Sequence, residues 1–135
     1  MVSLLSNSEE DIRVLAAGVL GVTLSFSDDA TFKSIMENSI LTTGQASPEI
    51  AVRHGKCVAL GQALKYNGER CIPYHQQIVE NDVAYIKDDT ILICMAGISV
   101  CKYVLNAYNT MSESNKVLLR ELNSLIETGS KGFNY

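Results

Sequence analysis

The amino-acid sequence predicts an all-α fold made of antiparallel helix pairs that stack side by side. Three observations lead to this expectation: an internal repeat, apolar residues at helical spacing, and helix-starting residues ahead of the repeated segments. The chain has 135 residues, of which 47% are hydrophobic, with 2 prolines and 9 glycines. This composition suits one globular domain and argues against a disordered chain.

The internal repeat relates three segments of similar sequence. Residues 10–24 (EDIRVLAAGVLGVTL) reappear at 50–64 (IAVRHGKCVALGQAL) with an offset of 40, so that Leu20 aligns with Leu60. A weaker copy at 89–105 (DTILICMAGISVCKYVL) follows with an offset of 39. A period near 40 is typical of HEAT and armadillo repeats, in which each helix pair covers the apolar face of its neighbour.

The predicted helices follow from their start signals and their apolar stripes. Ser8 precedes a run of acids, Ser47 precedes a proline, and Asp88 precedes the third copy, so each is expected to begin a helix. Six helices are predicted, near 8–25, 28–42, 48–66, 73–86, 89–109 and 112–128. The apolar stripes contain Phe32, Ile35, Met36 and Ile40 in the second helix, Val52, Gly55, Ala59, Leu60, Ala63 and Leu64 in the third, and Ile78, Val79, Val83 and Ile86 in the fourth.

This order of helices begins and ends with a helix that has no partner. We therefore expect residues 1–135 to form a single segment of HEAT type, excised from a longer solenoid, with repeat cores at 8–25, 48–66 and 89–109. Neighbouring repeats of the parent chain would cover the apolar surface that the two ends leave exposed.

The residues give little support for catalysis or for a bound metal or cofactor. The sequence nominates no nucleophile and no orienting carboxylate for either histidine. The four cysteines form no CxxC pair, and no phosphate-binding glycine motif is present. Gly18 and Gly21 are instead expected to let the two helices of a pair approach closely. We expect no enzyme activity, no catalytic residue, no metal and no cofactor, with an enzyme that has an unrecognised site as an alternative.

Charge and hydropathy bear on partners and location. The net charge of −4 and the pI near 5.1 argue against direct DNA binding. No run of 18 uncharged apolar residues is present, so no membrane partner is expected. Residues 1–11 lack the basic start of a signal peptide, and the cysteines suit a reducing compartment. A cytoplasmic location is therefore expected.

The candidate partner-binding residues are basic. Arg53, His54 and Lys56 make the densest basic group in the chain, and Arg13 occupies the position equivalent to Arg53 in the preceding repeat. Such arginines can form a ladder that bonds carboxylates or carbonyls of the next repeat. They can equally form a row of guanidinium groups for an acidic partner or for ribosomal RNA phosphates. The sequence leaves both interpretations open.

The stretch 52–71 (VRHGKCVALGQALKYNGERC) resembles a specific family. It is similar to the C-terminal HEAT-repeat region of the general-control translational activators, which activate the starvation-responsive kinase of translation initiation factor two. A generic HEAT repeat supplies the Val-Arg and Ala-Leu pairs of this stretch, but it does not usually supply Arg-His-Gly followed by a basic residue, as at 53–56. Arg70 and Cys71 close the loop of the same stretch.

The resemblance implies a non-catalytic, cytoplasmic scaffold that regulates translation. Its implied partners are the ribosome and the N-terminal domain of the protein kinase. The alternative is a HEAT-repeat scaffold or adaptor in another cytosolic process, such as proteasome adaptation or nuclear transport, since fold alone does not specify a partner.

Overall fold

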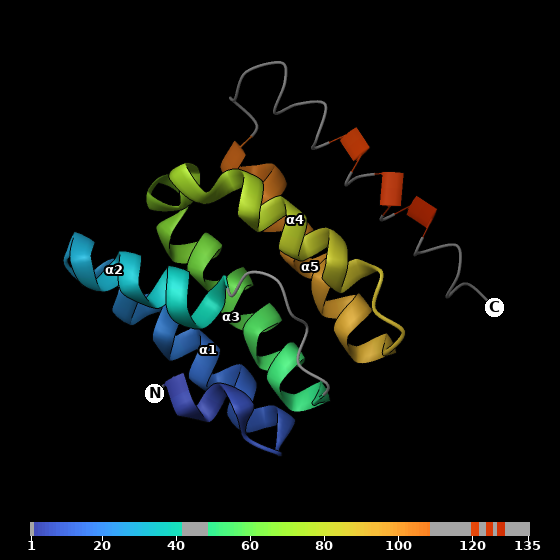
Figure 1. The fold of residues 1–135 in the computed structure, drawn as a ribbon, viewed down its shortest axis with the longest axis horizontal. Helices are drawn as coiled ribbons and strands as arrows, with labels where there is room; N and C mark the ends of the chain where they lie inside the picture. Colours follow the sequence, from blue (N-terminus) through green and yellow to red (C-terminus); the bar gives the residue numbers. More distant parts are fainter. Residues whose placement is uncertain (1, 42–48, 109–119, 122–123, 126, 129–135) are drawn as a thin grey trace.

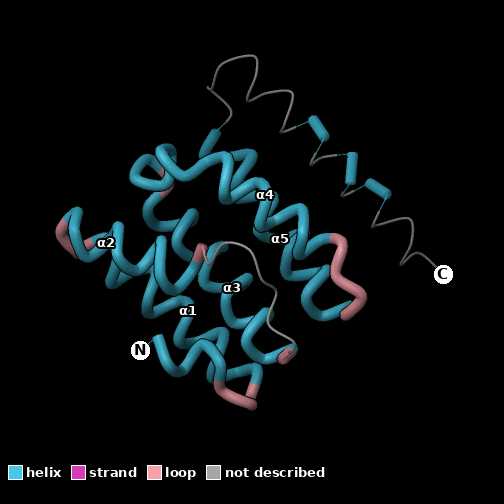
Figure 2. Tube along the Cα trace, in the orientation of Figure 1, coloured by secondary structure: helices cyan, strands magenta, loops and turns pink. Residues whose placement is uncertain are grey.

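The fold is all-helical, as predicted, over the residues that the structure describes. The computed structural model describes residues 2–41, 49–108, 120–121, 124–125 and 127–128. The elements are η1 (Val2–Ser6), α1 (Glu10–Ser25), α2 (Asp29–Ile35), the π-helical turn η2 (Met36–Ile40), α3 (Ile50–Asn67), the 3-10 helix η3 (Glu69–Tyr74), α4 (His75–Ile86) and α5 (Ile91–Tyr108), shown in Figures 1 and 2. Among the described helices, none is both long enough and apolar enough to cross a membrane.

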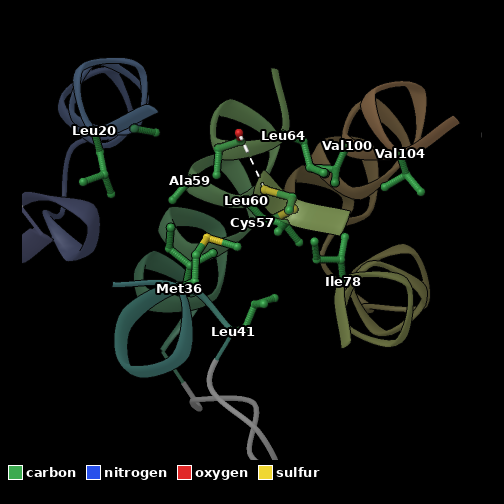
Figure 3. Close-up of a cluster of buried hydrophobic side chains, with 14 of the residues drawn as sticks. Leu20, Met36, Leu41, Cys57, Ala59, Leu60, Leu64, Ile78, Val100 and Val104 are labelled. Atoms are coloured by element: carbon green, nitrogen blue, oxygen red, sulfur yellow. Dashed lines mark hydrogen bonds between the residues drawn. The ribbon is translucent and has the colours of Figure 1, made fainter. Parts of the chain in front are cut away.

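The helices form two layers. Helices α1, α3 and α5 make one layer and run in the same direction, whereas α2 and α4 run the opposite way in the second (Figure 1). Helix α3 packs between α1 and α5, while η2 contacts α3 and α4 packs against α5. Figure 3 shows the layers end-on, one above the other. This is the arrangement of stacked helix pairs, with α2 paired to α3 and α4 paired to α5.

The hydrophobic core lies between the layers and repeats from helix to helix. Two sets of buried side chains hold equivalent places in α1, α3 and α5. One set is Leu20, Leu60 and Val100 (Figure 3), and the other is Leu24, Leu64 and Val104. Successive members are 40 residues apart, so the offset of 39 predicted for the third copy is wrong by one residue. That alignment matched Ala-Gly pairs, whereas burial follows the helical phase of the large apolar side chains.

The predicted stripes of the second and fourth helices are confirmed. Phe32, Met36 and Ile40 are buried along α2 and η2, and Ile78 is fully buried on α4. The sixth predicted helix, at 112–128, falls mostly outside the described residues, and the described positions within it are helical.

Helix starts lie later than predicted. Helices α1, α3, α4 and α5 begin at residues 10, 50, 75 and 91, each two residues after the expected position. Ser8 is not an N-cap, because the Asn7 side chain accepts the Glu9 N–H at 2.9 Å instead. Asp88 similarly accepts from Thr90 N at 2.8 Å ahead of α5. Pro73, the residue at which the fourth helix was expected to begin, lies inside η3, and Ser47 lies outside the described residues.

Gly21 permits a close approach between successive repeats. A Cβ at this position would lie 2.8 Å from the carbonyl oxygen of Gln62 in α3, closer than real Cβ contacts allow. The expectation that Gly18 and Gly21 serve packing within one helix pair is therefore wrong. Helices α1 and α3 belong to neighbouring pairs, and Gly18 faces open space.

Candidate functional site

Arg13 and His54, two of the predicted partner-binding residues, lie inside the protein. They are 4% and 2% exposed. Arg13 Nε donates to His54 Nδ1 at 3.0 Å, and Arg13 Nη1 donates to the carbonyl oxygens of Asn7 and Ser8 at 2.8 and 3.1 Å. Burial, followed by the positive charge of Arg13, lowers the pKa of His54 against an opposing effect of Glu10. The ring therefore stays neutral at pH 7 and accepts through Nδ1, with its proton on Nε2.

Arg53 connects α3 to the turn before α5. Its Nε lies 3.0 Å from Oδ2 of Asp88, and both side chains are half-buried. Nη2 of Arg53 also lies 3.4 Å from the Thr90 hydroxyl. Burial raises the pKa of Asp88, but hydrogen bonds from the Thr90 backbone and from Arg53 outweigh that effect and hold the pKa below its usual value. The carboxylate is thus charged at neutral pH and pairs with the guanidinium.

The four predicted residues do not form one exposed basic surface. Lys56 is half-buried and lines a separate hollow with Val2, Ser3 and Asn38. Arg53 bonds a carboxylate of the next repeat, as the ladder interpretation expected. Arg13 instead bonds a histidine of the next repeat and the carbonyl oxygens of Asn7 and Ser8 in its own repeat. Partner binding by these four residues stays a prediction.

Removing Arg13 is expected to destabilise the chain more than removing Arg53. Arg13→Ala should lower the free energy of unfolding by about 3 kcal/mol, because His54 and two carbonyl oxygens lose their buried donor. Arg53→Ala should cost about 1 kcal/mol, since a half-buried ion pair is partly solvated. Urea unfolding of both variants at pH 7 measures the difference. Equal losses of unfolding free energy would contradict the conclusion that the buried Arg13 contributes more to stability than Arg53.

Arg70, at the end of the stretch that carries the resemblance, holds the connection between repeats. Its Nη1 donates to the carbonyl oxygen of Leu24 at 2.8 Å, at the end of α1, and its Nη2 lies 3.2 Å from Asp29 at the start of α2. The guanidinium also stands 4.2 Å from the centroid of the Phe32 ring. Arg70 thus joins η3 to the turn between α1 and α2, which is a structural role.

Sequence reasoning missed an apolar groove between α1 and α3. It is lined by Val14, Leu15, Gly18, Val19 and Val22 of α1 and by Tyr66 of α3. Leu15 is 70% exposed, and Phe26 beyond the end of α1 is 85% exposed. The available signal was that α1 is apolar on nearly all sides, whereas a surface helix normally has one apolar stripe.

A second missed feature is a buried carboxyl group. Asp82 of α4 is 0% exposed, and neither of its carboxyl oxygens has a hydrogen-bond partner. Burial raises its pKa to about 8. Burial, and then the charge of Asp82, raises the pKa values of Cys57 and Cys101 on the two facing helices. In the described part of the chain, no group of three or more histidine, cysteine, aspartate or glutamate side chains lies close enough to hold a metal ion.

Comparison with known proteins gives one family. A family model described as "Stalled ribosome sensor GCN1-like, HEAT repeats" matches residues 1–131. The comparisons with curated proteins and with solved structures gave no match. The matched range contains both helical layers, the arginine ladder, the groove and the stretch at 52–71.

Proposed function

Because this chain belongs to the family of GCN1-like stalled ribosome sensors, as one of their HEAT-repeat regions, we propose that it is a non-catalytic scaffold segment that binds ribosomes. It couples them to the kinase of translation initiation factor two by binding the kinase's N-terminal domain. It works in the cytoplasm, as one segment of a longer solenoid. The observation that carries the proposal is the family match over residues 1–131.

The geometry of the stack supports a scaffold role. Contacts from Arg13 to His54 and from Arg53 to Asp88 fix each repeat relative to the next. Stacked helices held in this way present a continuous surface to large partners. Arg53 and Lys56, which are half-buried, are the proposed contact residues. Arg13 and His54, the other two predicted partner-binding residues, are buried.

Co-sedimentation of the purified chain with ribosomes tests this proposal. We expect the chain to pellet through a sucrose cushion with stalled ribosomes more than with elongating ribosomes. A pull-down with the kinase's N-terminal domain tests the second partner. Lys56→Glu should reduce the pelleted fraction, and Lys33→Glu on the outer surface of α2 is the matched control. Absence of both interactions would overturn the proposal, and capture of proteasome subunits or transport factors in their place would favour the alternative scaffold.

A further inference from the structure

The groove between α1 and α3 is an open and mostly apolar depression, lined from Val14 to Thr23 along α1 and by Gln62 and Tyr66 of α3. From Val14 to Thr23 this lining extends along about 13 Å of α1, which equals roughly two and a half helical turns. Gly18 is one of its lining residues, and a Cβ there would meet nothing within 4 Å. The space above Gly18, between Val14 and Val22, therefore accepts a large apolar side chain from outside. An exposed, continuous apolar groove of this kind marks an interaction site.

The two ends of the groove carry charges of opposite sign. Glu10 and Asp11 are exposed in the first turn of α1, ahead of Val14. Lys65 is exposed near the end of α3, with its Nζ 5.2 Å from the centroid of the Tyr66 ring that lines the groove. Because α1 and α3 run in the same direction, the acids and Lys65 lie at opposite ends (Figure 1).

The basic end is not neutralised by its own helix. Helix α3 contains no aspartate or glutamate. Glu69 follows in η3, and among the described residues no ion pair joins it to Lys65. Lys65 also borders a neighbouring hollow with Tyr103 and Asn106, neither of which is acidic. A ligand that brings negative charge to this end therefore meets a complementary charge.

We infer that this groove docks an amphipathic helix of another protein, antiparallel to α1. The helix has large apolar side chains on one face, acidic residues in its first turn and basic residues in its last turn. Its first turn lies at Lys65, near the ends of α1 and α3. Its last turn lies at Glu10 and Asp11. This binding mode is that of a helix in a groove, and it does not depend on the proposed ribosome binding.

Two synthetic peptides of equal composition test the inference. Both are 14-residue helices with leucines on one face; one carries glutamates in the first turn and lysines in the last, and the other carries the reverse. Fluorescence anisotropy with the full 135-residue chain measures their affinities. We expect the glutamate-first peptide to bind at least tenfold more tightly. Lys65→Glu should abolish that preference, while Lys87→Glu, exposed in the turn after α4, should leave it unchanged.

Gly18→Leu provides a variant that keeps its fold. Because an added Cβ would meet nothing within 4 Å, the leucine side chain starts in open space and extends over the groove. We expect unchanged thermal unfolding and at least tenfold weaker binding of the glutamate-first peptide. Equal binding of both peptides, insensitivity to Gly18→Leu, or displacement of the peptide by a single-stranded RNA oligonucleotide would overturn the inference. Self-association of the chain that Gly18→Leu abolishes would also overturn it, since the occupant would then be a second copy.

Ribosome sedimentation of the same variant keeps this inference apart from the proposed function. If Gly18→Leu loses peptide binding and still pellets with stalled ribosomes, the groove is a separate site, as inferred. If the wild-type chain pellets with ribosomes but binds neither peptide, the groove inference fails and the proposed function stands.

Discussion

Asp82→Asn is expected to raise the free energy of unfolding by about 4 kcal/mol at pH 7. The carboxyl group is 0% exposed and has no hydrogen-bond partner, so the folded chain keeps it protonated up to a pKa of about 8. In the unfolded chain the same group ionises near pH 3.8. Folding at pH 7 therefore requires Asp82 to take up a proton, and this costs free energy that an asparagine does not incur.

The pH dependence of this effect has a definite sign. Below pH 3.8 Asp82 is protonated in both states, and its burial carries no such penalty. Between pH 3.8 and about 8 the unfolded state ionises while the folded state does not, so stability contributed by this group falls as the pH rises. Urea unfolding of wild type and Asp82→Asn at pH 5 and pH 8 measures the difference between them. A difference that stays constant across this range would contradict the assignment of a buried, protonated carboxyl.

Much of the fold could be predicted because the core depends on residue spacing. Large apolar residues recur at 3.6-residue periodicity within each helix and at 40 residues between helices, so Leu20 and Leu60 were identified as equivalent positions. Helix starts were less well predicted. A serine or aspartate can cap a helix or form a different local hydrogen bond. Ahead of α1 the Asn7 side chain, not Ser8, accepts the Glu9 N–H, and Asp88 accepts the Thr90 N–H before α5 begins.

The candidate site was harder to predict because adjacent residues on a helix point in different directions. Arg53, His54 and Lys56 are close in sequence, but successive residues of a helix point about 100° apart. Their side chains therefore point in different directions: Arg53 toward the turn before α5, His54 toward α1 and Lys56 toward η1. The unpaired state of Asp82 depends on which side chains α3 and α5 place around it. That is a property of tertiary packing, which the local sequence around Asp82 does not contain.

Leu60→Asp should unfold the chain at pH 7, with a loss of at least about 4 kcal/mol. Leu60 is 1% exposed and lies on α3, the helix that packs between α1 and α5 (Figure 3). A carboxylate there removes apolar contacts that both neighbouring helices share, and it buries a charge with no partner. Because α3 contacts both α1 and α5, the loss of apolar contacts should destabilise all three helices and not α3 alone.

Leu15→Asp is the matched control for this substitution. The substitution is the same, leucine to aspartate, but Leu15 lies on α1 and is 70% exposed. Its replacement should therefore change the free energy of unfolding by less than about 1 kcal/mol. Circular dichroism melts of both variants separate the two effects. A small shift for Leu60→Asp, equal to that of Leu15→Asp, would contradict the repeat assignment that makes α3 the central helix. The two positions thus distinguish the apolar surface that holds the repeats together from the apolar surface that remains exposed for a partner.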